Sequence, residues 1–327
     1  MAALIATRLL HGVLVVLVVS VLAFLLGDVV GDPVASILGL DATAADRLAL
    51  RQRLHLDDPL VLRYLHSLAL PLHGDLGVSY TAQRPITDLL AERIPATVEL
   101  AATALLLSLS IGVPIGVYAA VRRGRVDAGL LMGLSIFGVS LPTFFFGILL
   151  ILCFSLVLGW LPPFGRGEVV RLGGWTTGLL TLSGLKSLIM PALSLAFGQV
   201  ALLARLTRAE MLDVLRSDYI RFARARGLRD RTIHLSHALR NTWIPIITVS
   251  GIQLGYLLAF AVVVEQVFQW PGMGLLFLQA LEQTDVPVIS AFLMTAALFF
   301  VGINFVVDLL YAVVDPRLRI RALAARS

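Results

Sequence analysis

The stretch RLTRAEMLDVLRSDYIRFARARGLRDRTIHLSHALRNTWIP, residues 205–245, interrupts an otherwise apolar chain and decides how that chain is arranged. It carries nine of the 26 Lys and Arg residues against four acids, and long apolar runs flank it on both sides. A bare charge in hydrocarbon costs at least about 2.5 kcal/mol. The stretch must therefore lie in water or against a soluble partner, between two membrane helices.

Within this stretch, residues 218–228 predict a short helix. Ser217 and Asp218 suit its start, where the Asp218 carboxylate can accept unpaired backbone N–H groups. The i, i+3, i+4 and i+7 positions of one helix face are then occupied in turn by Tyr219, Phe222, Ala223 and Arg226. A helix of about two turns is marginal alone in water, so it needs a surface to pack on.

The end of this helix is also marked. Gly227 can take the left-handed conformation that stops a helix, and Leu228 can make the apolar contact that accompanies such a stop. The alternative interpretation is an ordinary basic loop that only sets topology.

Composition indicates a polytopic membrane protein. Hydrophobic residues make up 58% of the 327 residues, charged residues only 14%, and the mean hydropathy is +0.90. The net charge of +5 is confined to loops, where the positive-inside rule explains it, so no nucleic-acid partner is expected. Cys153 is the single cysteine, which excludes a disulfide framework, and no metal-ligand cluster or metal-binding residue is predicted.

The apolar runs predict an all-α protein with six transmembrane helices. They cover residues 9–26, 94–121, 127–159, 187–206, 242–264 and 291–314. The first run could also be a signal peptide, but its 18 residues exceed a usual signal core. Pro142 should kink the third helix.

These runs divide the chain into four parts. They are a first transmembrane helix at 1–27, an extracytoplasmic loop at 28–93, a core domain at 94–315 with a loop at 208–241, and a basic tail at 316–327. Inside the first loop, residues 44–54 and 60–70 are expected to be helical.

Charge sets the orientation. With the N-terminus inside, 17 Lys and Arg residues lie on the inner side and 9 on the outer side. This bias places both termini and the 208–241 loop in the cytoplasm.

Sites of chemistry are scarce. The chain has no phosphate-binding Gly-x-x-x-x-Gly-Lys-Ser/Thr loop, no His-Glu-x-x-His and no Gly-x-Ser-x-Gly motif. The deep polar residues Gln199 and Gln253 either bond between helices or line a polar pathway. The pairs Gly112/Gly116, Gly129/Gly133 and Gly251/Gly255 have the small-xxx-small spacing of closely packed helices. We therefore expect no catalytic residues and no enzymatic activity.

Several longer motifs closely resemble the permease subunits of ABC importers for dipeptides, oligopeptides and nickel. The motifs are DYIRFARARGL at 218–228, HALRN at 237–241, LDDPL at 56–60, GDLGVS at 74–79, ERIPATVEL at 92–100, VVEQVFQWPGMG at 263–274 and DLLYAVVDPR at 308–317. They cover nearly the whole chain. The broad importer signature begins Glu-Ala-Ala, with a glycine four residues after the second alanine. Ala223 and Gly227 keep this spacing, whereas Arg221 replaces the glutamate and Phe222 replaces the first alanine, as is usual for the peptide branch.

The resemblance implies a type I ABC importer permease fold in a bacterial inner membrane. The residues it implies for ATPase coupling are Asp218, Tyr219, Arg221, Phe222, Ala223, Arg224, Ala225, Arg226, Gly227 and Leu228. Phe222 and Ala223 would make the apolar contact, and the arginines would pair with acids on the ATPase or with nearby phosphates.

It further implies a heterodimer with a second homologous permease, two cytoplasmic ATPase subunits and an extracytoplasmic solute-binding protein. ATP and Mg would be bound by the ATPases, with no cofactor in this chain. Dipeptides or oligopeptides are the expected substrate, and nickel chelates, glutathione or another small solute the alternatives. A secondary transporter driven by an ion gradient is the competing class, against which the shallow placement of the charged groups argues.

Overall fold

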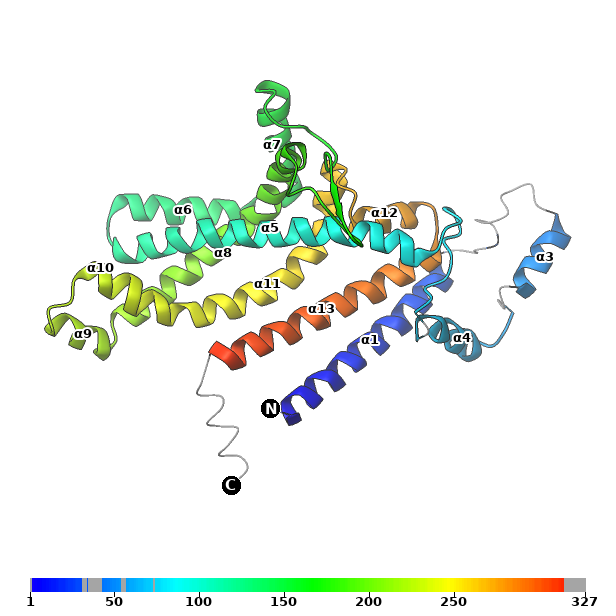
Figure 1. Cartoon of the computed structure of the whole chain (residues 1–327), viewed down its shortest axis with the longest axis horizontal. Helices are drawn as coiled ribbons and strands as arrows, with labels where there is room; N and C mark the ends of the chain where they lie inside the picture. Colours follow the sequence, from blue (N-terminus) through cyan, green and yellow to red (C-terminus); the bar gives the residue numbers. More distant parts are fainter. Residues whose placement is uncertain (1, 31–33, 35–42, 54–56, 73, 315–327) are drawn as a thin grey trace. The chain divides into compact units, whose positions relative to one another are not determined.

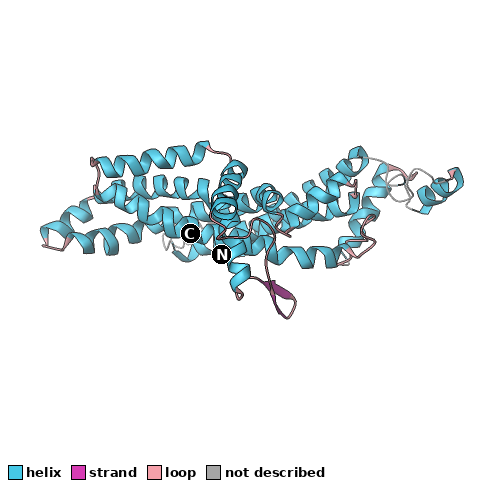
Figure 2. Cartoon of the chain, turned by 90° about the horizontal axis from the view of Figure 1, so that it is seen from above, coloured by secondary structure: helices cyan, strands magenta, loops and turns pink. Residues whose placement is uncertain are grey.

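The computed structural model describes residues 2–30, 34, 43–53, 57–72 and 74–314, and almost all of the regular structure in them is helical (Figures 1 and 2). The predicted tail at 316–327 lies outside the described residues. The elements are α1 (Ala2–Val30), α3 (Ala44–Arg53), α4 (Leu60–Leu72), α5 (Ile86–Val121), α6 (Val126–Ser140), α7 (Thr143–Leu150), the π-helix η1 (Ile151–Val157), β1 (Val170–Leu172), β2 (Trp175–Thr177), α8 (Leu182–Leu215), α9 (Asp218–Ala225), α10 (Asp230–Thr232), the π-helix η2 (Ile233–Ala238), α11 (Leu239–Phe268), α12 (Met273–Glu282) and α13 (Val286–Val314). Both helices expected in the first loop are confirmed as α3 and α4.

Four described helical stretches are long and apolar enough to cross a bilayer, by length and composition. They cover residues 86–121, 182–215, 230–268 and 286–307. The apolar stretches 10–26, 126–135 and 143–157 are shorter than 18 residues. The count of six spans and the side on which the termini lie therefore stay predictions.

The third predicted span is broken rather than kinked. The chain leaves helical geometry at Leu141, with φ −86° and ψ 129°, and α7 starts after Pro142. A residue before proline is pushed out of the α region, and proline has no N–H to continue the ladder. Figure 1 shows α7 running in a different direction from α6.

The chain divides into two compact units, residues 1–97, 171–176 and 271–302 in the first and 98–170, 177–270 and 303–327 in the second. These are contact units, and the predicted domain boundaries stay predictions. In the first unit, the start of α5 packs with α12 and α13 through Ile86, Leu90, Leu276 and Ile289.

A buried carboxylate holds the turn at residues 79–81 in the first unit. Asp285 accepts hydrogen bonds from the Ser79 hydroxyl at 2.5 Å, from the Thr81 hydroxyl at 2.8 Å and from the backbone N–H of Tyr80 at 3.2 Å. Burial, and then the Asp285 charge, raises the pKa of the Tyr80 phenol. The turn is therefore fixed by one acid that lies about 200 residues away in the sequence.

In the second unit α8 is central and packs on α6, α7 and α11. Gly112 and Gly116 let α5 approach α8: a Cβ on Gly116 would lie 2.6 Å from the Thr207 Cβ. The second predicted pair differs, because a Cβ on Gly129 or Gly133 would meet no described atom within 4 Å. In the third pair, a Cβ on Gly251 would overlap a Val307 methyl carbon, so Gly251 lets α11 approach α13.

Candidate functional site

The predicted short helix is present as α9, Asp218–Ala225. Its end is a Schellman motif: the N–H of Leu228 donates to the Ala223 carbonyl at 3.3 Å, and that of Gly227 to the Arg224 carbonyl at 2.9 Å. Gly227 has φ +75°, as the sequence predicted. The backbone stop after α9 was therefore readable from local residues.

The start of α9 differs from the prediction. Ser217 occupies the N-cap position without a side-chain cap bond, and its hydroxyl instead donates to the Val214 carbonyl at 2.5 Å. Asp218 pairs with Arg221 one turn later, on the exposed surface. The expected capping by Asp218 was wrong, because an arginine at i+3 offers its carboxylate a charged partner.

One face of α9 is buried against its own chain. Ile220 is fully buried and Ala223 is 7% exposed, in a cluster with Ala120 of α5, Met211 of α8 and Ile233 of η2. The sequence grouped Ala223 with Phe222 in an apolar contact with an ATPase; the structure packs Ala223 within its own chain, and the contact with an ATPase stays a prediction. Sequence reasoning also missed Ile220, although Ile220 and Ala223 stand at i and i+3, the spacing of a buried stripe.

Tyr219 ties α9 to the next helices. Its hydroxyl accepts a hydrogen bond from the Asn241 side-chain amide at 2.5 Å and donates to the His237 carbonyl at 3.3 Å. With the apolar cluster below, these bonds supply the packing surface that an eight-residue helix needs.

The other face of α9 is open to solvent. Phe222 is 64% exposed, and the Arg226 guanidinium lies 5.8 Å from its ring centroid. Arg221 and Arg224 are exposed beside it. We name these four residues the α9 surface. It consists of an exposed aromatic side chain beside three arginines, on a helix whose opposite face packs on the rest of the chain.

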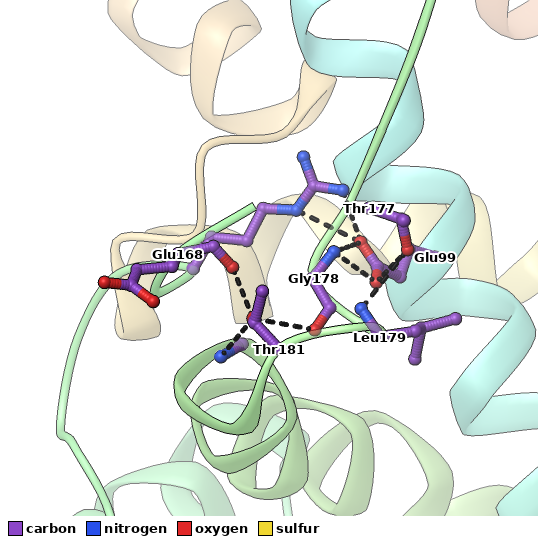
Figure 3. A network of polar contacts seen from close by, with 8 residues as sticks. Glu99, Glu168, Thr177, Gly178, Leu179 and Thr181 are labelled. Atoms are coloured by element: carbon purple, nitrogen blue, oxygen red, sulfur yellow. Dashed lines mark hydrogen bonds and ion pairs between the residues drawn. The ribbon is translucent and has the colours of Figure 1, made fainter. Parts of the chain in front are cut away.

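A second cluster in the same unit is buried (Figure 3). The Glu99 carboxylate on α5 accepts from Arg166 Nε at 3.1 Å, from the Thr177 hydroxyl at 3.2 Å and from the N–H of Gly178 at 3.0 Å. The Glu99 and Arg166 side chains are 3% and 6% exposed, and Arg166 also lies 5.9 Å from the Trp270 ring. Next to it, the Thr181 hydroxyl donates to the Glu168 carbonyl at 2.6 Å and accepts from Gly184 N–H at the start of α8.

The predicted pathway residues lie on different helices. Gln199 of α8 is 7% exposed, and its Oε1 has no hydrogen-bond partner among the described residues. Gln253 of α11 is half-buried. No hydrogen bond among the described residues joins the two side chains, so their role as pathway residues stays a prediction.

Comparison with protein families decides the class. The model of the binding-protein-dependent transport system inner membrane component matches residues 112–320. The chain belongs to this family. The permease is thus a multi-pass inner membrane component of an ABC importer, which confirms the resemblance read from its motifs.

Curated relatives agree over nearly the whole length of the permease. It is 40% identical to the glutathione transport system permease protein GsiC of Escherichia coli O6:H1 over 313 residues, 95% of this chain and 97% of the relative. It is 39% identical to the proteins of the same name from Escherichia coli K12 and Shigella flexneri serotype 5b, with the same coverage.

Solved structures show the fold. Two crystal forms of the MetNI methionine ABC transporter, described as inward facing, match with TM-scores of 0.56 and 0.57 at 18% identity. Each match covers 69% of the permease and 96% of the solved chain. The type I importer permease fold expected from the sequence is confirmed.

Proposed function

We propose that this permease forms half of the translocation pathway of an ATP-driven importer of short peptides, and that the α9 surface receives the force of a cytoplasmic ATPase. The observation that carries this is Phe222, which is 64% exposed on a helix whose other face is buried. Large apolar side chains that protrude from a rigid base are typical anchors of protein interfaces. The three arginines around it fit an acidic rim on the partner.

The proposed partners are those that the resemblance to ABC importers implies. They would be a second homologous permease, two ATPase subunits that bind ATP and Mg, and an extracytoplasmic solute-binding protein. Closure of the ATPases would move α9 together with Met211 and Ala120, because all three belong to one apolar cluster. The bundle would then switch between outward-facing and inward-facing states.

The substrate class rests on the relatives and the motifs together. The curated relatives carry the name of glutathione, which is a tripeptide, and the motifs resemble the peptide branch. We propose short peptides with glutathione as the first candidate, ahead of nickel chelates. Uptake of labelled glutathione, a dipeptide and a nickel chelate by the reconstituted complex would rank the three.

Gln199 and Gln253 are proposed to line the pathway. A buried amide oxygen such as that of Gln199, which has no hydrogen-bond partner among the described residues, is costly unless water or a solute satisfies it. Gln199→Leu should then change the apparent affinity for the peptide without changing basal ATP hydrolysis. An unchanged affinity in both Gln199→Leu and Gln253→Leu would remove these residues from the pathway.

Orientation can be tested with one reporter cysteine. Cys153 is the only cysteine, so Cys153→Ser gives a clean background. Arg229→Cys should react with a membrane-impermeant maleimide only from the cytoplasmic side. Labelling from outside intact cells would reject a cytoplasmic α9.

The coupling role is tested by Phe222→Ala in the reconstituted complex. Solute-stimulated ATP hydrolysis and uptake should fall at least tenfold, while the permease itself stays folded. Leu235→Ala is the control, because Leu235 is 47% exposed on η2 and lies outside the α9 surface. Full coupling in Phe222→Ala would contradict the proposal.

The competing class is a secondary transporter. In that case the purified permease alone, in vesicles with a proton or sodium gradient, would accumulate substrate. ATP dependence that disappears when the ATPases are omitted would exclude it.

A further inference from the structure

A groove of about 540 Å³ opens between the last turns of α5 and the first turns of α6. Five of its seven lining residues are apolar: Pro114, Ile115, Leu130, Leu131 and Leu134. The α6 lining residues stand at positions 127, 130, 131 and 134, so the groove follows that helix for about 10 Å at 1.5 Å per residue. Leu130 and Leu134 are 65% and 66% exposed. The walls of the groove are therefore apolar and exposed.

One end of this groove is strongly basic. Arg122, Arg123 and Arg125 form the turn between the two helices, and Asp127 is the acid in the lining. The Asp127 carboxylate accepts from the Tyr118 hydroxyl at 2.8 Å and lies 3.5 Å from Arg125 and 3.8 Å from Arg122. Arg122 and Arg125 share this one carboxylate, and Arg123 adds a third basic residue to the turn, so the turn next to the apolar groove has an excess of positive charge.

The two ends together match one kind of molecule. Apolar walls suit an acyl chain, whereas a cluster of arginines at the end of a membrane helix suits a phosphate. The geometry points to a bound anionic phospholipid, with its acyl chain along Leu130 and Leu134 and its phosphate at Arg122–Arg125.

The site lies at the α9 end of this unit. Ala120, two residues before Arg122, belongs to the apolar cluster that supports Ile220. The lipid therefore comes from the leaflet on the α9 side. It is a retained ligand that is selected by its headgroup, unlike the general lipid coat of an apolar helix.

The test is the lipid that the assembled transporter retains. After incorporation in bilayers of equal phosphatidylglycerol and phosphatidylcholine, native mass spectrometry should find phosphatidylglycerol enriched by about fivefold, the order expected for one basic residue beside an anionic lipid. Equal retention of the two lipids by the unmodified transporter would overturn the proposal.

Variants separate a site from general surface charge. Arg123→Gln with Arg125→Gln should abolish the enrichment, and Asp127→Asn should increase it by freeing the flanking arginines. Leu130→Trp with Leu134→Trp fills the groove without changing charge, and should also lose the lipid. Leu106→Trp is the control, since Leu106 is a 65% exposed α5 residue outside the groove, and it should retain the lipid.

The groove-filling variant keeps the proposal falsifiable if loss of the arginines disturbs insertion. Full phosphatidylglycerol retention in that variant would show that charge alone, without the groove, holds the lipid. A photocrosslinker placed at Leu131 should react with lipid, and a crosslink to a helix of the second permease instead would reject the lipid site.

Discussion

The α9 surface and the Glu99 network use charge in opposite ways. On α9 the ion pair of Asp218 and Arg221 is exposed, with side chains 91% and 73% accessible. The buried residues of this helix are the apolar Ile220 and Ala223. At Glu99 the ion pair itself is buried, and Glu99 holds Arg166, Thr177 and Gly178 against α5. Glu99 and Ala120 lie on the same helix, about 30 Å apart along its axis, which is close to the thickness of a hydrocarbon core.

The difference teaches where charges remain available to a partner. An exposed pair is worth about 0–1 kcal/mol and can exchange partners at little cost. A buried pair is held in place, because removal of one member leaves the other charge unpaired in a low dielectric. We therefore expect substitutions of the charged α9 residues to leave the stability of the permease almost unchanged and to reduce the coupling of transport to ATP hydrolysis. Substitution of Glu99 should instead reduce stability.

Loss of the Glu99 carboxylate should have the largest effect. Glu99→Ala leaves Arg166 buried without its main counter-ion and should destabilise the permease by about 3–5 kcal/mol, measured by thermal unfolding in detergent. Arg84→Ala is the control, since the Arg84–Glu92 pair is about half exposed and should cost at most about 1 kcal/mol. Equal losses in the two variants would remove the contrast between buried and exposed pairs.

Truncation of the buried α9 anchor comes next. Ile220→Ala should loosen α9 by about 2–4 kcal/mol, because it opens a cavity in a packed cluster. Trypsin cleavage at the α9 arginines reports this local opening and should speed up. Phe222→Ala should leave the cleavage rate unchanged; a similar increase there would mean that Phe222 supports the fold as well.

A smaller effect is expected at the end of α9. Gly227→Ala should cost about 1 kcal/mol, because φ +75° strains a residue with a Cβ although no described atom lies within 4 Å of that position. Gly227→Glu should cost the isolated permease a similar amount, and its larger penalty should appear only in ATP-coupled uptake. Gly174→Ala, at an exposed glycine with open space and no positive φ, is the control for stability.

The smallest effect should follow loss of the exposed pair. Asp218→Asn should change unfolding by about 0.5 kcal/mol, and the difference should shrink as salt is raised. Thermal unfolding at low and high ionic strength measures this. A loss of several kcal/mol would show that the α9 charges are structural after all.

Local features of the chain were predictable. The C-terminal end of α9, the left-handed Gly227 and the helices α3 and α4 depend on neighbouring residues, and the sequence indicated each of them. The break at Pro142 was anticipated only as a kink, because proline marks the position and the surrounding packing decides the angle. The Glu99–Arg166 pair was missed, since 67 residues separate its members and neither has a local signal.

By itself the sequence determined the membrane class, the family and the position of the short helix α9, since hydropathy, loop charge and turn chemistry are properties of short windows. Only the tertiary structure decided that Ile220 and Ala223 are buried, that Glu99 pairs with Arg166, and that an apolar groove ends near the Arg122–Arg125 turn. Burial depends on which distant residues arrive to cover a side chain, and a linear pattern does not contain that information.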